Sequence, residues 1–151
     1  MPGARDGAFL AALYLSTRPD LGALPVPRSV VDGIATHQRA LRDADFAQRY
    51  PQAQAWIVEH NGDSVGWLLL AQQGDGLRVV DLAVAAPQRR KGVARTLLGA
   101  LQDDPPGAGA ITLRVRASNH AARALYASLG FTLQQDDDDT LELSWRRQAA
   151  T

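Results

Sequence analysis

The chain begins with two stretches of helical periodicity. Residues 6–17 are predicted to form a short helix with Asp6 as a suitable N-cap. Five side chains recur on one face of it at helical spacing: Phe9, Leu10, Leu13, Tyr14 and Thr17. Residues 29–50 form a second candidate helix, closed by Pro51, with a stripe at Val30, Ile34, His37 and Leu41. The segment 18–27 between them contains three prolines and is predicted to be a loop.

From residue 55 onward the apolar spacing becomes that of strands. Residues 56–60 and 65–70 flank Asn61 and Gly62, a dipeptide that favours a hairpin turn. A turn at residues 74–76 leads into residues 77–84, which are almost continuously apolar. Such a run is typical of a central strand that is covered on both faces.

The second half alternates helices and strands. A basic segment after Pro87 opens a helix whose stripe extends to Leu101, and residues 111–115 alternate as a strand. The next helix ends at Gly130, and residues 131–135 and 140–145 predict a closing hairpin around a solvated acidic loop at 136–139. This order predicts a mixed α/β fold, in which helices flank a largely antiparallel sheet, as one domain over residues 1–151.

Composition excludes several classes of protein. Hydrophobic residues make up 46% and charged residues 21%, and 16 basic residues balance 16 acidic ones, so we expect a globular domain with no nucleic-acid or membrane partner. Cysteine is absent, and His37, His60 and His120 lack metal-ligand spacing, so no metal is expected. No secretory signal and no stretch of about 20 apolar residues is present, which predicts a cytoplasmic location.

The junction between the strand 77–84 and the following helix is the most informative part of the sequence. A helix start presents unpaired N–H groups and the positive end of the helix dipole. Gly92 and Ala94 leave this backbone approachable, while Arg89, Arg90, Lys91 and Arg95 surround it with positive charge. Basic residues are unfavourable at a helix N-terminus unless an anion compensates them, so we expect a pyrophosphate or similar anion here rather than a merely solvated surface.

Two motifs at these positions resemble those of the GNAT N-acetyltransferase superfamily. Residues 89–94 are similar to the signature Arg/Gln-x-x-Gly-x-Gly/Ala, with Arg90 where glycine is common. About 25 residues further on, a second element matches the family's other cofactor motif through Asn119, Ala122, Tyr126, Gly130 and Phe131. The resemblance extends over residues 6–147.

The resemblance implies that acetyl-CoA binds where the strand 77–84 splays away from the strand at 110–117. The backbone of Leu82, Ala83 and Val84 would pair with the pantetheine arm, and Asn119 would bond the arm from the other wall. The pyrophosphate would lie at the helix start, where the binding residues are Arg89, Arg90, Lys91, Gly92, Val93, Ala94 and Arg95. An N–H group near Val84 would polarise the thioester carbonyl.

The resemblance also suggests catalytic residues. Tyr126 occupies the family position whose hydroxyl protonates the departing thiolate, although on its helical stripe it could equally be a core residue. Asp81 lies in an apolar strand beside the predicted cleft and is the candidate general base; the alternative is a salt bridge with a neighbouring arginine. Glu59, His60 and His37 are weaker candidates for the base.

The predicted reaction is acetyl transfer to a primary amine of a small molecule or peptide by direct attack, since no cysteine can carry the acyl group. One alternative is an acetyl-CoA-binding module without activity. Another, a Rossmann-type nucleotide domain, lacks its glycine signature here. We also expect the family's first strand to be missing or vestigial, because only five residues precede Asp6, and a homodimer is possible.

Overall fold

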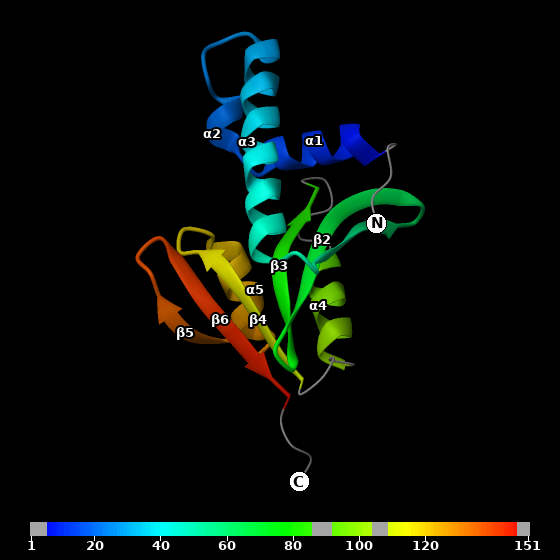
Figure 1. Cartoon of the computed structure of the whole chain (residues 1–151), viewed down its shortest axis with the longest axis vertical. Helices are drawn as coiled ribbons and strands as arrows, with labels where there is room; N and C mark the ends of the chain where they lie inside the picture. Colours follow the sequence, from blue (N-terminus) through cyan, green and yellow to red (C-terminus); the bar gives the residue numbers. More distant parts are fainter. Residues whose placement is uncertain (1–5, 86–91, 104–108, 148–151) are drawn as a thin grey trace. The chain divides into compact units, whose positions relative to one another are not determined.

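The computed structural model describes residues 6–85, 92–103 and 109–147. Its elements, in chain order, are α1 (Gly7–Ser16), α2 (Pro19–Gly22), α3 (Arg28–Arg49), β1 (Gln54–His60), β2 (Asp63–Gln73), β3 (Gly76–Val84), α4 (Val93–Asp103), β4 (Ala110–Arg116), α5 (His120–Ser128), β5 (Thr132–Asp136) and β6 (Thr140–Arg146). The strands hydrogen-bond in the order β1-β2-β3-β4-β6-β5 (Figure 1). This mixed α/β arrangement, with a mostly antiparallel six-stranded sheet and flanking helices, confirms the predicted fold class.

Contacts within the chain divide it into two compact units, and β2 and β3 run through both. The first unit holds residues up to Leu69 together with the segment that starts at Asp81, and the second holds Leu70–Val80 and the chain from Gly92.

In the first unit, the proline-rich segment after α1 is helical in part. The prediction of a loop throughout 18–27 is wrong, because Pro19 stands at the first position of α2, where its fixed φ favours a helical turn and its missing N–H costs no hydrogen bond. Leu21 on this turn packs with Tyr14, Val31 and Ala35 in a small core that joins the three helices.

The buried face of α3 differs from the predicted one. Ile34 of the predicted stripe is partly buried against the core of this unit, but Val30 and Leu41 are among the exposed large hydrophobic residues, and His37 is exposed as well. The buried face instead follows Val31 and Ala35, and polar side chains continue it as half-buried residues at Gln38, Arg39 and Arg42. Hydrophobicity alone selected the wrong face because the second half of the inner face is polar.

The hairpin β1–β2 has the turn that its sequence predicts. Asn61 and Gly62 both have positive φ, at 53° and 85°, as a two-residue type I′ turn requires. Further along β2, the N–H of Ala85 donates to the carbonyl of Val65 at 2.7 Å, and an ideal Cβ on Gly66 would lie 2.7 Å from the carbonyl oxygen of Ala83. The backbones therefore approach so closely at Gly66 that a side chain has no room there.

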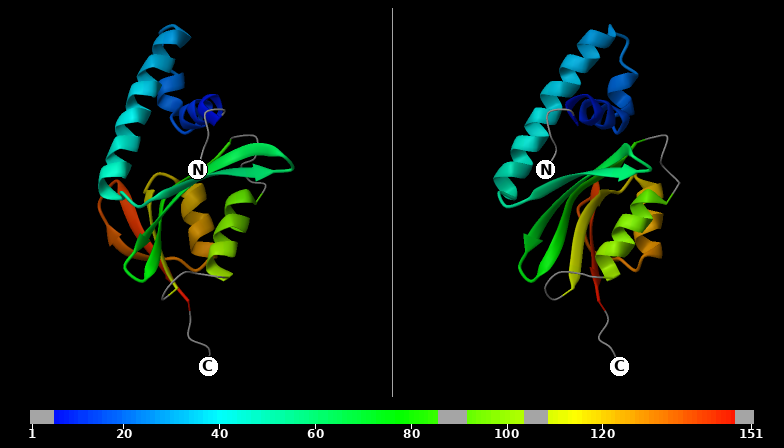
Figure 2. Two further views of the ribbon diagram at one scale, coloured as in Figure 1. Left: turned by 45° about the vertical axis from the view of Figure 1, so that its right-hand side comes forward. Right: turned by 90° about the vertical axis from the view of Figure 1, so that its right-hand side faces the viewer.

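The second unit is built around β4. The start of β3 pairs with it in parallel over Leu77–Val79, and β6 pairs with it in antiparallel register, with Leu113 opposite Leu143. The helices α4 and α5 cover one face of β4 and β6 (Figure 2). Leu98 of α4 and Ile111 of β4 are fully buried there, so this face supplies the unit's apolar core.

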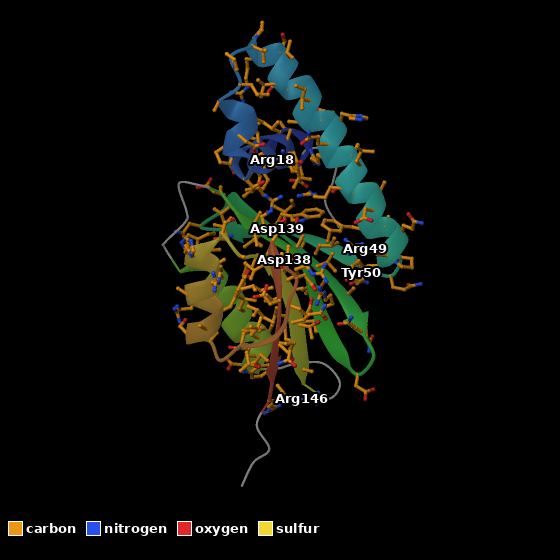
Figure 3. All side chains as sticks on the ribbon, turned by 90° about the vertical axis from the view of Figure 1, so that its left-hand side faces the viewer. Arg18, Arg49, Tyr50, Asp138, Asp139 and Arg146 are labelled. Carbon is orange, nitrogen blue, oxygen red and sulfur yellow. The ribbon has the colours of Figure 1, made fainter. Side chains whose placement is uncertain are left out.

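The other face of β4 and β6 is polar. Arg78 of β3 is 7% exposed, and both terminal nitrogens of its guanidinium donate to the carboxylate of Glu142 on β6, one of them at 3.0 Å. Arg114 lies beside the same carboxylate, at 3.6 Å. The predicted acidic loop is exposed, with Asp138 and Asp139 at the turn into β6 (Figure 3).

The expected absence of a first strand falls on residues 1–5, which lie outside the described residues. The first described element is α1, which begins at Gly7 as the periodicity predicts.

Candidate active site

Asp81, the predicted base, lies in the first unit near the end of β3. Two donors meet at one of its oxygens: Trp67 Nε1 donates to Oδ2 at 3.1 Å, and Arg42 Nη1 lies 3.2 Å from the same atom. No described side chain donates to Oδ1, and the side chain of Asp81 is 24% exposed. Both described side-chain partners of the carboxylate therefore meet at one of its oxygens.

The surroundings of Asp81 favour its neutral form. Burial raises the pKa of the carboxyl above its ordinary value, and the neighbouring charge of Asp43 adds to this, while Arg42, the Trp67 hydrogen bond and the backbone N–H of Leu82 act in the opposite direction. A carboxylate with a raised pKa is a stronger proton acceptor than an exposed one, as a general base requires.

Arg42 is the salt-bridge partner that the sequence indicated without identifying it. Besides Asp81 it contacts Asp43, at 3.1 Å, and its guanidinium lies over two rings, 4.9 Å from the centre of Tyr14 and 5.5 Å from that of Phe46. These contacts place Arg42 between α1, α3 and β3. The ion pair between Arg42 and Asp81 thus links α3 to β3 at the predicted base.

A pocket lies beside this group, between the helices and the strands of the first unit. Its lining residues are Leu10, Leu13, Tyr14, Thr17, Arg39, Arg42, Asp43, Trp67 and Ala83. Two of them, Arg42 and Trp67, are the donors that contact Asp81. The pocket is small, at about 20 Å³, and its charged lining consists of two arginines and Asp43.

The strand that follows Asp81 carries the residues predicted to bind the pantetheine arm. Because Ala85 donates to β2 and strand residues alternate in direction, the N–H and C=O groups of Leu82 and Val84 point away from β2, while those of Ala83 point towards it. The side chains of all three are half-buried.

In the second unit, the predicted anion site is described from Gly92 onward; Arg89, Arg90 and Lys91 lie outside the described residues. Gly92 has a φ of +80°, and among the described residues beyond its chain neighbours, no atom lies within 4 Å of a Cβ placed on it. It directly precedes α4, and its carbonyl accepts from the N–H of Thr96. Val93 and Ala94 are half-buried, and Arg95 donates to Ser128 of α5 at 2.8 Å. None of the described residues thus fills the space in front of Gly92, which is compatible with a phosphate-binding turn.

The second predicted motif occupies α5. Asn119 is the N-cap, and its Oδ1 accepts from the N–H of Ala122 at 3.2 Å. Tyr126 is 9% exposed and meets Phe131 edge to face, with 5.8 Å between ring centres. Asn119 therefore has a structural role in addition to the predicted one, and Tyr126 is packed on the apolar side of its helix.

The weaker base candidates are placed on the surface. Glu59, His60 and His37 are all exposed. Among the described residues, no group of three or more histidine, cysteine, aspartate or glutamate side chains is arranged to hold a metal ion. Within the same ranges, no helix combines the length and apolarity needed to cross a membrane.

Sequence reasoning missed Trp67 and Arg39. The periodicity identifies Trp67 only as an apolar strand position, whereas its indole N–H is what fixes Asp81. Arg39 and Arg42 could have been found by extending the stripe of Val31 and Ala35 along α3, since they follow at helical spacing.

Comparison with protein families identifies the family of this chain. The model of the acetyltransferase (GNAT) family matches residues 6–131, which include both motifs and every predicted site residue. The chain belongs to the GNAT acetyltransferase family. The predicted enzyme class, an acyl-CoA-dependent N-acetyltransferase, is confirmed at this level. No curated protein sequence matches the chain significantly.

Solved structures of GNAT acetyltransferases resemble this chain over most of its length. An acetyltransferase from Thermus thermophilus matches with a TM-score of 0.67 and 16% identity, over 94% of this chain and 91% of its own. PaiA N-acetyltransferase from Thermoplasma acidophilum, in complex with coenzyme A, gives 0.65 and 13%, over 94% and 93%. The ribosomal-protein-S18-alanine N-acetyltransferase from Escherichia coli gives 0.58 and 25%, over 72% and 79%.

Proposed function

We propose that this enzyme transfers the acetyl group of acetyl-CoA to a primary amine by direct attack. The observation that carries the proposal is the family match over residues 6–131, because it spans both cofactor motifs and both candidate catalytic residues. The structure of the PaiA relative with coenzyme A supports the choice of co-substrate.

The residues present fit acetyl-CoA. The open space in front of Gly92, at the start of an 11-residue helix, suits a pyrophosphate that takes hydrogen bonds from N–H groups. Arg89, Arg90, Lys91 and Arg95 would add charge there. Leu82 and Val84 would pair with the pantetheine arm through the edge of β3 that points away from β2. Asn119 uses Oδ1 for capping, which leaves its amide N–H₂ to donate to the arm.

When bound, acetyl-CoA supplies an activated acyl group and a thiol that leaves readily. Asp81 would accept through Oδ1 the proton that the acceptor's ammonium loses before or as its nitrogen attacks the thioester, while Arg42 and Trp67 keep Oδ2 in place. The Tyr126 hydroxyl donates the proton that the departing sulfur takes up. Both roles rest on ordinary acid–base chemistry, and neither requires a covalent enzyme intermediate.

The test is an amine panel in which release of free thiol from acetyl-CoA is measured, with melting temperature recorded in parallel. Acetyl-CoA at about 100 times its Kd should stabilise the fold by about 2.7 kcal/mol. Gly92→Glu should abolish this shift, since it places negative charge where phosphates belong. Gly74→Glu is the matched control: it alters another glycine of positive φ with open surroundings, at the β2–β3 turn. The proposal would be overturned if no amine of the panel caused release of free thiol, or if acetyl-CoA did not raise the melting temperature.

A further inference from the structure

A second pocket lies in the second unit, where β3 and β4 begin and β6 ends. It has a volume of about 220 Å³, against about 20 Å³ for the pocket of the first unit, and all of its lining residues belong to the second unit. These residues are Gln73, Asp75, Gly76, Leu77, Ala110, Thr112 and Arg146. None of them is assigned to the candidate active site or to either cofactor motif, so the proposed acetyl transfer leaves this pocket without a role.

Two small residues on neighbouring strands account for the space in the second pocket. Gly76 and Ala110 lie side by side, because an ideal Cβ on Gly76 would be 2.6 Å from the carbonyl oxygen of Ala110 and 3.2 Å from its Cβ. On the other side of Ala110, its partner in the antiparallel pair of β4 and β6 is Arg146. A glycine and an alanine extend little beyond the backbone, so they form a low floor between the larger side chains around them.

Two opposite charges line this pocket without pairing. Asp75 stands in the turn before β3, and Arg146 is the last residue of β6 (Figure 3). Because β4 lies between β3 and β6, and neighbouring strands are about 4.8 Å apart, the backbones that carry the two charges are separated by roughly 10 Å. Neither side chain forms an ion pair or a hydrogen bond with any other described residue. The pocket therefore offers an anion and a cation that do not neutralise each other.

A neutral side chain adds a further hydrogen-bond donor. The hydroxyl of Thr112 donates to Oε1 of Gln73 at 2.7 Å, which fixes the oxygen end of this amide. The amide nitrogen of Gln73 donates to no described residue and is therefore able to donate to a ligand.

We propose that the second pocket binds a small zwitterion, a linear amino acid whose carboxylate contacts Arg146 and whose ammonium group contacts Asp75. A guanidinium matches a carboxylate through two parallel N–H donors, and an ammonium group donates to a carboxylate. A ligand with only one of these charges would leave the opposite wall unpaired. Since the two charges are carried by strands that are not adjacent, ω-amino acids with a longer chain suit the pocket better than glycine. This binding is independent of the proposed acetyl transfer.

The experiment is a titration of the full chain, without acetyl-CoA, followed by NMR chemical shifts of the backbone amides. The probes are glycine, 4-aminobutanoate and 6-aminohexanoate, with butylamine and butanoate as counterparts that carry a single charge. The amides of Leu77 and Thr112 should shift with 4-aminobutanoate, and the Kd from these shifts should be lower than that for glycine or either counterpart. Arg146→Met and Asp75→Asn should each raise this Kd by roughly 5- to 20-fold, because each removes one charged contact at an exposed site.

Two matched variants control for charge alone. Arg147→Met removes the same charge from the next residue, and Asp63→Asn alters an exposed aspartate beside the β1–β2 turn; neither residue lines the pocket, and both variants should bind 4-aminobutanoate as the parent chain does. The melting temperature of each variant verifies that it is folded.

Three results would overturn the proposal. The first is that 4-aminobutanoate shifts neither the Leu77 nor the Thr112 amide, including the case in which it shifts only amides around Asp81. The second is that butylamine or butanoate binds at these amides as tightly as the zwitterion. The third is that folded Arg146→Met and Asp75→Asn keep the Kd of the parent chain.

Discussion

Gly66→Ala tests the close approach of β2 to β3 beside the predicted cofactor strand. The added Cβ would lie 2.7 Å from the carbonyl oxygen of Ala83, whereas carbon–oxygen contacts normally begin at roughly 3.3 Å. The obstructing atom belongs to the backbone and cannot move aside as the end of a flexible side chain does. The strands must therefore separate by about 0.6 Å, or β3 must distort locally.

Overpacking of this kind costs roughly 1–3 kcal/mol, which for a chain of this size corresponds to a fall in Tm of roughly 2–12 °C. Because Ala83 stands between the residues proposed to pair with the pantetheine arm, the affinity for acetyl-CoA should fall as well. The assay is thermal unfolding with and without acetyl-CoA, together with a cofactor titration.

Gly99→Ala provides a control of opposite sign. It adds the same methyl group within α4, where no described atom outside the neighbouring helix backbone lies within 4 Å of the new Cβ, and should stabilise the chain by roughly 0.5–1 kcal/mol. If Gly66→Ala kept both the Tm and the cofactor affinity of the parent chain, the close backbone approach and the cofactor strand assigned beside it would both be refuted.

Three other substitutions examine separate parts of the structure. Tyr126→Phe should keep the fold and cofactor affinity but lower kcat by about 100-fold or more; an unchanged kcat would make it a core residue only. Arg42→Met should move the acid limb of the pH profile of kcat/KM to higher pH. Burial already raises the pKa of Asp81, and the charge of Arg42 opposes that rise. If the acid limb stayed at the same pH, Asp81 would be excluded as the base. Glu142→Gln should lower the free energy of unfolding in urea by on the order of 3 kcal/mol, because it removes the carboxylate that faces the buried guanidinium of Arg78. As a control, Asp137→Asn on the exposed rim should change it by less than about 0.5 kcal/mol.

Local patterns were enough to predict most of the strands and turns. Asn61 and Gly62 predicted their own positive φ values because few other dipeptides adopt that turn, and Gly130 predicted the end of α5 for the same reason. Pro19 misled the prediction because proline is compatible both with a loop and with the first turn of a helix, and only the packing of Leu21 selects the helix.

The error at α3 has a different cause. A helix face is normally recognised by its apolar residues, and Val30 and Leu41 are more apolar than Gln38 or Arg42. The structure nevertheless turns the polar residues inward, because partners distant in sequence meet them there. Arg42 contacts a carboxylate on β3 and the ring of Tyr14 on α1. Gln38 accepts from Arg18, which also donates to Tyr14. Partners that are distant in sequence cannot be recognised from the hydrophobic periodicity of one helix.

The same reasoning explains what could be known about Asp81. A lone carboxylate in an apolar strand indicated that some compensating group must exist, and so both a catalytic and a structural interpretation followed from sequence. The structure supplies the compensation, but it places both side-chain donors on one oxygen: Trp67 and Arg42 meet at Oδ2. A purely structural ion pair gains most when a carboxylate uses both oxygens, as Asp20 does with Arg18 at 3.0 and 2.9 Å. One-sided anchoring instead fixes the orientation of Asp81 while leaving Oδ1 with no described side-chain donor. A general base needs both a fixed orientation and an oxygen that no side chain occupies. Asp81 can therefore form an ion pair with Arg42 and still act as a general base.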